Sequence, residues 1–324
     1  MRLQRNARAA AAAAATAFVA STTLAGGAAQ ATPAQAGAVV VDDVLTISGT
    51  NAADQITLDF TAPDSVVVDF GGNNGAQHFV SGTFHAAAVD LRSGDDQFRT
   101  ISGGALVDVP TTVTAGNGND TATTGAARDV LVGGNGADFV NGGVGTDAEL
   151  LGNGDDTAAW NPGDGNDAID GGLGRDTLTF NGSNGDELMS LSANGASAVF
   201  LRSLGNIRMD LQGVERLDLA TVGGVDTVTI GDLSGTDVTE ADIDLAATTG
   251  AADAKEDTVH VFGTDLADRV DVTADGGSVD VTGLAAQTNV TGGDPTDRLM
   301  IDTLGGNDSV TVSDSARALL TIQP

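Results

Sequence analysis

Short runs of alternating apolar and polar residues follow one another along most of the chain. Between residues 39 and 114 they include VLTI, QITLDF, SVVVDF and AAVDL. After residue 207 they include RMDL, ERLDL, DTVTI, DTVHV, DRVDVT, SVDVTGL, RLMIDT and DSVTV. Gly, Asp and Asn separate these runs, which is the pattern of short strands joined by turns. The pattern predicts an all-β fold, either a continuous solenoid or stacked sheets. Thr236 to Lys255 breaks the pattern and is predicted to be a loop or a short helix.

A nine-residue repeat occupies Ala115 to Thr179. It reads AGNGNDTAT, TGAARDVLV, GGNGADFVN, GGVGTDAEL, LGNGDDTAA, PGDGNDAID and GGLGRDTLT, with Trp160 and Asn161 inserted before the sixth unit. Every unit has an aspartate at the same place: Asp120, Asp129, Asp138, Asp147, Asp156, Asp167 and Asp176. Four residues ahead of each aspartate stands a glycine: Gly116, Gly125, Gly134, Gly143, Gly152, Gly163 and Gly172. Two residues ahead stand Gly118, Ala127, Gly136, Gly145, Gly154, Gly165 and Gly174.

Each unit combines a glycine-rich turn with a short strand whose middle residue points inward. One unit is then half a coil, and eighteen residues complete one turn of a flattened parallel solenoid. Asp120, Asp138, Asp156 and Asp176 are predicted to line a first edge, and Asp129, Asp147 and Asp167 a second edge. The predicted inward residues are Ala122, Leu131, Val140, Glu149, Ala158, Ile169 and Leu178, which form a thin core.

The repeat resembles that of bacterial hemolysin-type (RTX-like) calcium-binding proteins, whose nonapeptide is G-G-x-G-x-D-x-U-x, U being apolar. The resemblance implies a parallel β-roll with Gly/Asp-rich loops that bind Ca²⁺ between successive turns. The ligands it implies are the seven aspartates, together with loop glycines that offer carbonyl oxygens. These glycines are Gly116, Gly118, Gly134, Gly136, Gly143, Gly145, Gly152, Gly154, Gly163, Gly165, Gly172 and Gly174.

Stacked aspartates also need a cation on electrostatic grounds. Carboxylates about 4.8 Å apart repel by about 1 kcal/mol in water and by about 3 to 4 kcal/mol at an effective dielectric constant of 20. Calcium prefers an all-oxygen shell and would supply much of the folding energy. The alternative is a metal-free solenoid closed by Gly/Asp turns.

Two units depart from the repeat, and both faults lie on the second edge. TGAARDVLV keeps only Gly125 and Asp129 of the loop residues. Glu149 takes an inward apolar position, so a bulge or a shift toward Leu150 is expected there. The first edge is therefore expected to be the more regular one.

A longer repeat flanks the nonapeptides. Gly49 to Ile56 resembles Gly263 to Val270, and Gly182 to Leu188 resembles both but is one residue shorter. Each copy precedes a Gly-x-Asp turn, with spacings of 42 (Asp54 to Asp96), 40 (Asp186 to Asp226) and 40 (Asp268 to Asp308). This predicts three diverged modules. Their Asp96, Asp226 and Asp308 turns could bind metal, but they lack a Gly-x-Gly, which favours plain turns capped by aspartate.

Composition narrows the function. The net charge of −31 and the pI near 4.1 argue against nucleic acid or an anionic membrane surface as a partner. Cysteine is absent, so the fold uses no disulfides. Met1 to about Ala31 reads as a secretory signal with three arginines, an alanine-rich apolar stretch and cleavage after Ala31 or Ala36, the alternative being an Ala-rich helix. The sequence has no later apolar stretch long enough to insert in a membrane, so an extracellular protein is expected.

Candidate catalytic groups are few. His78, His85 and His260 belong to no metal or catalytic motif, and Lys255 is the single lysine. A calcium-dependent carbohydrate-active enzyme of the lyase or epimerase kind is an alternative, and it would use the local group of Arg202, Arg208 and Arg216. The sequence instead predicts a non-enzymatic, secreted calcium-binding β-solenoid with a structural, surface or matrix role, its cell-surface or polysaccharide partner left open. The predicted segments are a signal peptide (1–31), an N-terminal β-repeat module (32–114), the calcium β-roll (115–180) and C-terminal β-repeat modules (181–324).

Overall fold

The computed structural model describes residues 35–72, 75–102 and 109–324, and the segment predicted to be a signal peptide lies outside them. The chain divides into two compact units. Unit 1 comprises the described residues up to Ala159 together with Gly163–Gly174, and unit 2 comprises Trp160–Pro162 and Arg175–Pro324. The boundary therefore falls within the segment predicted to be the calcium β-roll.

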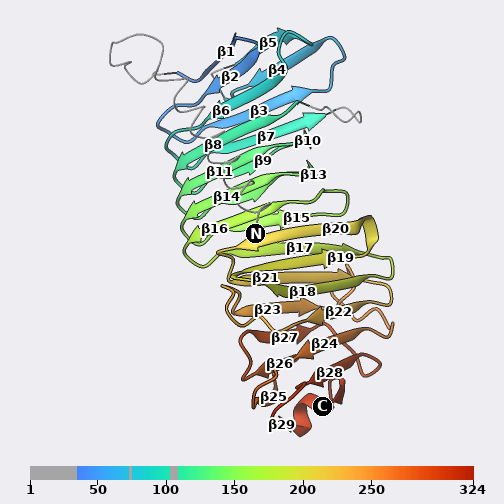
Figure 1. The fold of residues 1–324 in the computed structure, drawn as a ribbon. Helices are drawn as coiled ribbons and strands as arrows, with labels where there is room; N and C mark the ends of the chain where they lie inside the picture. The colour runs from blue at the N-terminus through green and yellow to red at the C-terminus, as the bar shows by residue number, and fades with distance from the viewer. Residues whose placement is uncertain (1–34, 73–74, 103–108) are drawn as a thin grey trace. The chain divides into compact units, whose positions relative to one another are not determined.

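Unit 1 consists of short strands that alternate between two sheets (Figure 1). Its strands are β1 (Gly37–Val41), β2 (Val44–Ser48), β3 (Gln55–Phe60), β4 (Ser65–Asp69), β5 (Ala76–Val80), β6 (Ala86–Asp90), β7 (Gln97–Ser102), β8 (Thr111–Asn117), β9 (Thr121–Thr123), β10 (Ala126–Ala127), β11 (Val130–Asn135), β12 (Phe139–Asn141), β13 (Val144–Gly145), β14 (Ala148–Asn153), β15 (Thr157–Trp160) and β16 (Ala168–Leu173). One sheet has the order β1-β2-β6-β8-β11-β14-β16, and the other has the order β15-β12-β9-β7-β3-β4-β5. Strands β10 and β13 pair with each other in a separate two-stranded sheet.

Unit 2 repeats this plan. Its elements are β17 (Thr177–Ser183), β18 (Leu188–Asn194), β19 (Ser197–Arg202), a 3₁₀ turn (Leu204–Asn206), β20 (Ile207–Gln212), β21 (Arg216–Val222), β22 (Thr227–Ile230), β23 (Glu240–Asp244), β24 (Thr258–Phe262), β25 (Arg269–Asp275), β26 (Ser278–Thr282), β27 (Gln287–Thr291), β28 (Arg298–Asp302), β29 (Ser309–Val312), α2 (Asp314–Arg317) and β30 (Thr321–Gln323). One sheet has the order β20-β19-β18-β22-β24-β28-β30 and the other β29-β25-β26-β27-β23-β21-β17.

The parallel register of unit 1 shows the eighteen-residue coil directly. Val113 of β8 pairs with Leu131 of β11, which pairs with Glu149 of β14. Glu149 in turn pairs with Ile169 of β16, two residues later than the repeat requires, because Trp160 and Asn161 are inserted. The prediction of a parallel β-roll with further β-repeats on both sides is confirmed.

The core of the nonapeptide region is the predicted row of inward residues, and all seven are buried. Glu149 is one of them. The expected bulge or shift toward Leu150 is wrong, because β14 keeps its register and the side chain of Glu149 points inward, whereas Leu150 is only half-buried. Leu151 is the next inward residue and is fully buried.

Antiparallel excursions explain the spacing of about forty residues in the longer repeat. In each module a coil strand is followed by two more strands that fold back beside it: β3-β4-β5, β18-β19-β20 and β25-β26-β27. The coil strand then pairs in parallel with β7, β22 or β29 of the next coil. A module is therefore one solenoid coil enlarged by a three-stranded meander.

The predicted excursion at Thr236 to Lys255 is only partly correct. It contains strand β23, which pairs in parallel with both β21 and β27. The alternation of acidic and apolar residues in EADID places Ala241 and Ile243 in the core, so this strand is an ordinary rung of the sheet. In the part of the chain that the structure describes, no helix has the length and apolar character needed to cross a membrane.

Candidate calcium-binding edges

The first edge of unit 1 is a ladder of aspartates. Oδ1 of Asp138 accepts a hydrogen bond from the backbone amide of Asp120, and Oδ1 of Asp156 accepts one from the amide of Asp138 (2.8 and 2.7 Å). The ladder extends beyond the nonapeptides, because the amide of Asp96 donates to Asp120 and the amide of Asp54 donates to Asp96. Each aspartate thus ties its own coil to the preceding one.

The glycines of this edge are required by the backbone. Gly116, Gly118, Gly134, Gly136, Gly152, Gly154, Gly172 and Gly174 all have positive φ angles, between 100° and 138°. A Cβ at Gly136 would overlap the carbonyl oxygen of Gly118, and one at Gly154 would overlap that of Gly136. The loops therefore stack with backbone against backbone, which leaves room for no side chain at these positions.

Three of these aspartates have a second carboxylate oxygen that accepts no hydrogen bond from the described residues. The three atoms are Oδ2 of Asp96, Asp120 and Asp138, and all are buried. Burial, above all, raises the pKa of Asp138 to about 6; the charges of Asp156 and Asp120 act in the same direction, and the backbone hydrogen bond acts against them. Stacked, buried carboxylate oxygens beside glycine carbonyls are the donors that Ca²⁺ prefers, so these residues fit the ion.

The second edge is built differently. The amides of Thr111, Asp129 and Asp147 donate to Oδ1 of Asp129, Asp147 and Asp167, so an aspartate ladder is present here too. Gly143 and Gly163 have positive φ angles, but Gly125, Gly145 and Gly165 do not. The short pair β10–β13 runs through these loops and aligns Ala127 with Gly145. The second edge therefore accepts alanine at position 127, whereas a Cβ added at Gly145 or Gly165 would overlap a backbone carbonyl oxygen of the preceding coil, as on the first edge.

The structure places Asp176 in unit 2. Its backbone amide donates to Oε2 of Glu215 at 2.7 Å, so a glutamate takes the place of the next aspartate in the ladder. Asp226, Asp257 and Asp297 form a separate ladder in this unit, because they precede β22, β24 and β28 of the other sheet; its hydrogen bonds measure 2.8 and 2.9 Å. The roles of Asp176 and the other predicted ligands in metal binding remain predictions.

The Gly-x-Asp turns outside the nonapeptides share this geometry. Arg92, Val222 and Leu304 stand four residues before Asp96, Asp226 and Asp308, and each has a positive φ angle (79°, 76° and 57°). A positive φ is rare for a residue other than glycine and costly for a β-branched one. These turns therefore have the same backbone conformation as the nonapeptide turns, although a residue other than glycine stands four positions before the aspartate. No sequence signal could have shown this, because the three residues have no property in common that favours the conformation.

The third copy of the longer repeat is aligned on Glu187 rather than on Asp186. The backbone amide of Glu187 donates to Oδ1 of Asp226, as that of Asp54 does to Asp96 and that of Asp268 to Asp308. Ser183 hydrogen-bonds to the Glu187 carboxylate as Thr264 does to that of Asp268. The predicted shortening by one residue is thus wrong: the copies have equal length and differ in Asp against Glu.

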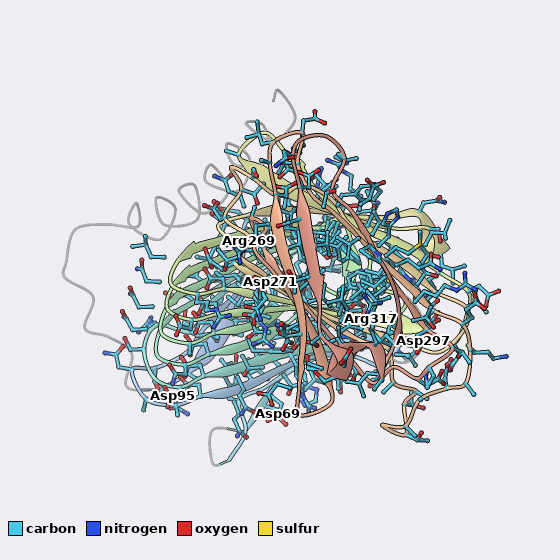
Figure 2. All side chains as sticks on the ribbon, turned by 90° about the horizontal axis from the view of Figure 1, so that it is seen from below. Asp69, Asp95, Arg269, Asp271, Asp297 and Arg317 are labelled. Atoms are coloured by element: carbon cyan, nitrogen blue, oxygen red, sulfur yellow. The ribbon has the colours of Figure 1, made fainter. Side chains whose placement is uncertain are left out.

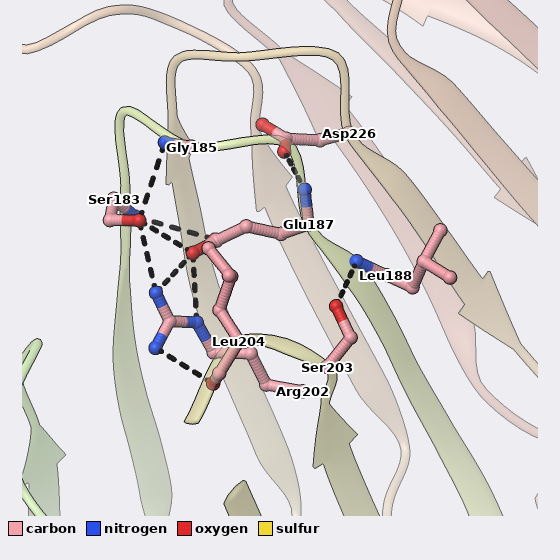
Figure 3. Close-up of polar contacts among 8 residues, drawn as sticks. All are labelled: Ser183, Gly185, Glu187, Leu188, Arg202, Ser203, Leu204 and Asp226. Carbon is pink, nitrogen blue, oxygen red and sulfur yellow. Dashed lines mark hydrogen bonds and ion pairs between the residues drawn. The ribbon is translucent and has the colours of Figure 1, made fainter. Parts of the chain in front are cut away.

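Glu187 has a buried cationic partner (Figure 3). Arg202 donates from Nε to Oε1 of Glu187 (2.9 Å), from Nη2 to the Ser183 hydroxyl (3.0 Å) and from Nη1 to the carbonyl of Leu204 (3.2 Å). The side chains of Arg202 and Glu187 are 6% and 0% exposed. The guanidinium also lies 5.1 Å from the ring centroid of Trp160, which stacks on Phe180.

The three arginines named in the enzyme alternative have separate partners. Arg202 pairs with Glu187, Arg208 with Asp210 on its own strand, and Arg216 of β21 with Asp242 of β23. Many other acidic side chains lie toward solvent, among them Asp69 and Asp95 at the periphery of unit 1 (Figure 2). Among the described residues no three His, Cys, Asp or Glu side chains form a ready-made metal-binding group, so a bound ion must also take backbone carbonyl oxygens.

Stacked parallel coils whose edges carry buried aspartates and glycine carbonyls define a calcium-binding β-solenoid. The family model of the RTX calcium-binding nonapeptide repeat matches the chain in four copies, over residues 114–148 and 163–178. The chain is therefore an RTX-like calcium-binding repeat protein, and Ca²⁺ is the ion that these repeats bind. A search of curated proteins finds no match.

Proposed function

We propose that this is a secreted protein that folds when it binds extracellular Ca²⁺ and then serves as a structural element at a cell surface or in a matrix. The observation that carries the proposal is the row of buried Oδ2 atoms on Asp96, Asp120 and Asp138, for which the described residues provide no hydrogen bond. When bound, calcium supplies positive charge between successive coils. The chain itself supplies the alignment, through the amide-to-Oδ1 ladder.

Charge supports folding outside the cell. Removing residues 1–31 would take away Arg2, Arg5 and Arg8 and no acid, so the mature net charge would be −31 − 3 = −34. Such a chain repels itself where calcium is scarce. Weak extracellular calcium sites have dissociation constants of about 10⁻⁴ to 10⁻³ M, which millimolar calcium fills.

A structural role is favoured over catalysis. A carbohydrate-active site of the lyase or epimerase kind would need arginines that converge beside the cation. Here Arg202 is enclosed by its own partners, and Arg208 and Arg216 pair with carboxylates on different strands. The repeated edges and sheet faces suit a spacer or a lattice element.

Far-UV circular dichroism of the mature chain, titrated with Ca²⁺ and reversed by a chelator, tests the proposal. A cooperative gain of β signal with Ca²⁺, and little gain with Mg²⁺, is expected. Asp138→Ala should weaken the response more than Asp129→Ala, because the first edge has the complete glycine set. Trp160 belongs to unit 2, where it stacks on Phe180, so its fluorescence reports on the folding of that unit. A chain fully folded in chelator and indifferent to both ions would refute calcium-driven folding.

A further inference from the structure

Glu149 is an acidic side chain in an otherwise apolar row. Its neighbours in parallel register are Leu131 and Ile169, both buried and inward, and Glu149 itself is only 2% exposed. Its Oε1 accepts a hydrogen bond of 2.7 Å from the backbone amide of Gly142. The family match breaks off just before Glu149 and resumes at residue 163.

The hydrogen bond to Gly142 explains why an acceptor stands at this position. One coil earlier, the backbone amide of Thr124 donates a hydrogen bond of 3.0 Å to the carbonyl of Asn141, which lies seventeen residues later in the chain. The corresponding acceptor for Gly142 is the carbonyl of Ala159, which instead accepts from Nδ2 of Asn141 (2.9 Å). Gly142 therefore turns to Glu149. A neutral glutamine would accept this bond equally well, so the bond does not explain the negative charge.

The charge of Glu149 stands among other negative charges. Its carboxylate and that of Asp147 meet at Gly142, whose amide donates to Oε1 of Glu149 and at which an added Cβ would lie 2.6 Å from Oδ2 of Asp147. Asp147 is also 2% exposed, and its Oδ2 accepts no hydrogen bond from the described residues. Uncompensated carboxylates in a dry interior are strongly unfavourable.

The two deeply buried glutamates of the chain differ in their counter-charge. Glu187 has the guanidinium of Arg202. None of the ion pairs found among the described residues involves Glu149 or Asp147. Since a buried carboxylate persists only with a partner or a proton, this pair of carboxyl groups must either stay protonated or bind a cation that the described residues do not supply.

We propose that Glu149 is an additional calcium ligand, which reaches the second edge from inside the coil and binds one divalent cation together with Oδ2 of Asp147. Two carboxylates balance the charge of a hard divalent ion, and backbone carbonyls or water complete its oxygen shell. The nonapeptide repeat has an apolar residue where Glu149 stands, so this ligand is outside the repeat's own set. This proposal rests on the calcium-dependent folding proposed above. The experiment below distinguishes failure of the Glu149 site from failure of calcium-dependent folding.

The variant that decides is Glu149→Gln, which keeps the acceptor for Gly142 and removes only the charge. Isothermal titration of wild type and variant with Ca²⁺ is expected to show one ion fewer in the variant, or one site weakened by about tenfold or more. Urea unfolding in chelator should show the variant at least as stable as wild type, because the buried charge is gone. Glu256→Gln is the control, since it removes one charge from an exposed residue that pairs with Arg298 and should leave the calcium stoichiometry unchanged.

Each other outcome has a defined meaning. If Glu149→Gln binds as many ions as wild type with the same affinities, Glu149 is only a cap for Gly142 and the proposal is overturned. If wild type itself binds no calcium, calcium-driven folding fails first. If the variant does not fold, carboxyl-carbon NMR of the unchanged chain answers the question: the Glu149 resonance must shift on titration with Ca²⁺, and a static resonance overturns the proposal.

Discussion

The backbone amide of Asp120 donates a hydrogen bond of 2.8 Å to Oδ1 of Asp138, eighteen residues further along the chain. Oδ2 of the same Asp138 is buried and accepts no hydrogen bond from the described residues. One carboxylate oxygen therefore joins two coils, while the other is available to an ion. The structural and the ion-binding roles of a single aspartate can be separated by substitution.

Asp138→Asn and Asp138→Ala should behave differently. Asparagine keeps an oxygen for the Asp120 amide and removes the charge, so we expect weaker calcium binding with no loss of stability in chelator. Alanine leaves that amide without its acceptor, which costs about 1 to 3 kcal/mol with or without calcium. Urea unfolding of both variants, in chelator and in excess Ca²⁺, checks this. Equal losses for the two variants in chelator would contradict the division of roles.

Gly136→Ala should destabilise unit 1 more than Gly163→Ala. Both glycines have positive φ angles (125° and 113°), so alanine is strained at either position. At Gly136 the added Cβ would also overlap a carbonyl oxygen of the preceding coil. A Cβ added at Gly163 would have no atom within 4 Å. The difference between the two midpoints of thermal unfolding therefore measures the close stacking of loops. Identical midpoints would mean that the backbone angle alone requires glycine.

The periodic features of this fold are readable from sequence because each depends on spacing. The nine-residue step determines which aspartates share an edge, and the alternation within strands determines the inward row from Ala122 to Leu178. The ladder from the Asp120 amide to Asp138 follows from that stacking but could not be predicted, because spacing does not show which oxygen of a carboxylate faces the neighbouring amide.

The features that could not be predicted from the sequence depend on the backbone conformation and the hydrogen bonds of single residues. Val222 adopts a positive φ that β-branched residues avoid, so propensity argues against the turn it makes. Glu187 replaces an aspartate and is recognised as its equivalent only through its hydrogen bond to Asp226. Glu149 stays inward because Gly142 needs an acceptor, which a pattern of apolar positions cannot indicate.

Val222→Gly should stabilise unit 2. Val222 has a φ of 76°, and glycine removes the strain of about 1 to 3 kcal/mol that a residue other than glycine carries there. Greater chain entropy in the unfolded state offsets up to about 1 kcal/mol of this gain. Val225→Gly, three residues later at an exposed position without positive φ, is the matched control and should be neutral or destabilising. A variant at position 222 that is no more stable than the control would show that the strain is small.

Arg202→Met should destabilise unit 2 by about 3 to 5 kcal/mol, because it leaves the Glu187 carboxylate buried without its counter-charge. Adding Glu187→Gln to this variant should recover part of the loss. Trp160 fluorescence is a suitable probe of urea unfolding, since the guanidinium lies 5.1 Å from its ring. Arg208→Met breaks a half-exposed pair with Asp210 and should cost less than about 1 kcal/mol. Equal effects at the two arginines would contradict a special role for the buried pair.

Acid should stabilise the calcium-free chain. Burial, above all, raises the pKa of Asp138 to about 6 and that of Asp226 to about 7, from an ordinary value of 3.8. A carboxyl with a raised folded-state pKa contributes stability that is complete below pH 3.8 and is lost as the pH rises through 6 to 7. Without calcium, the urea concentration at the unfolding midpoint should therefore decrease as the pH is raised from 5 to 7.5.

Calcium should abolish or reverse this dependence, because the ion replaces the proton as the partner of the buried carboxylates and the two compete. The measurement is a set of urea midpoints across pH 5 to 7.5, on metal-depleted protein and at saturating Ca²⁺. Asp138→Asn separates the buried group from the general charge of the chain: its metal-free midpoint should depend less on pH than that of wild type. A metal-free stability that rises with pH would mean that these aspartates are ionised and already compensated within the protein, and calcium would then have no buried charge to neutralise.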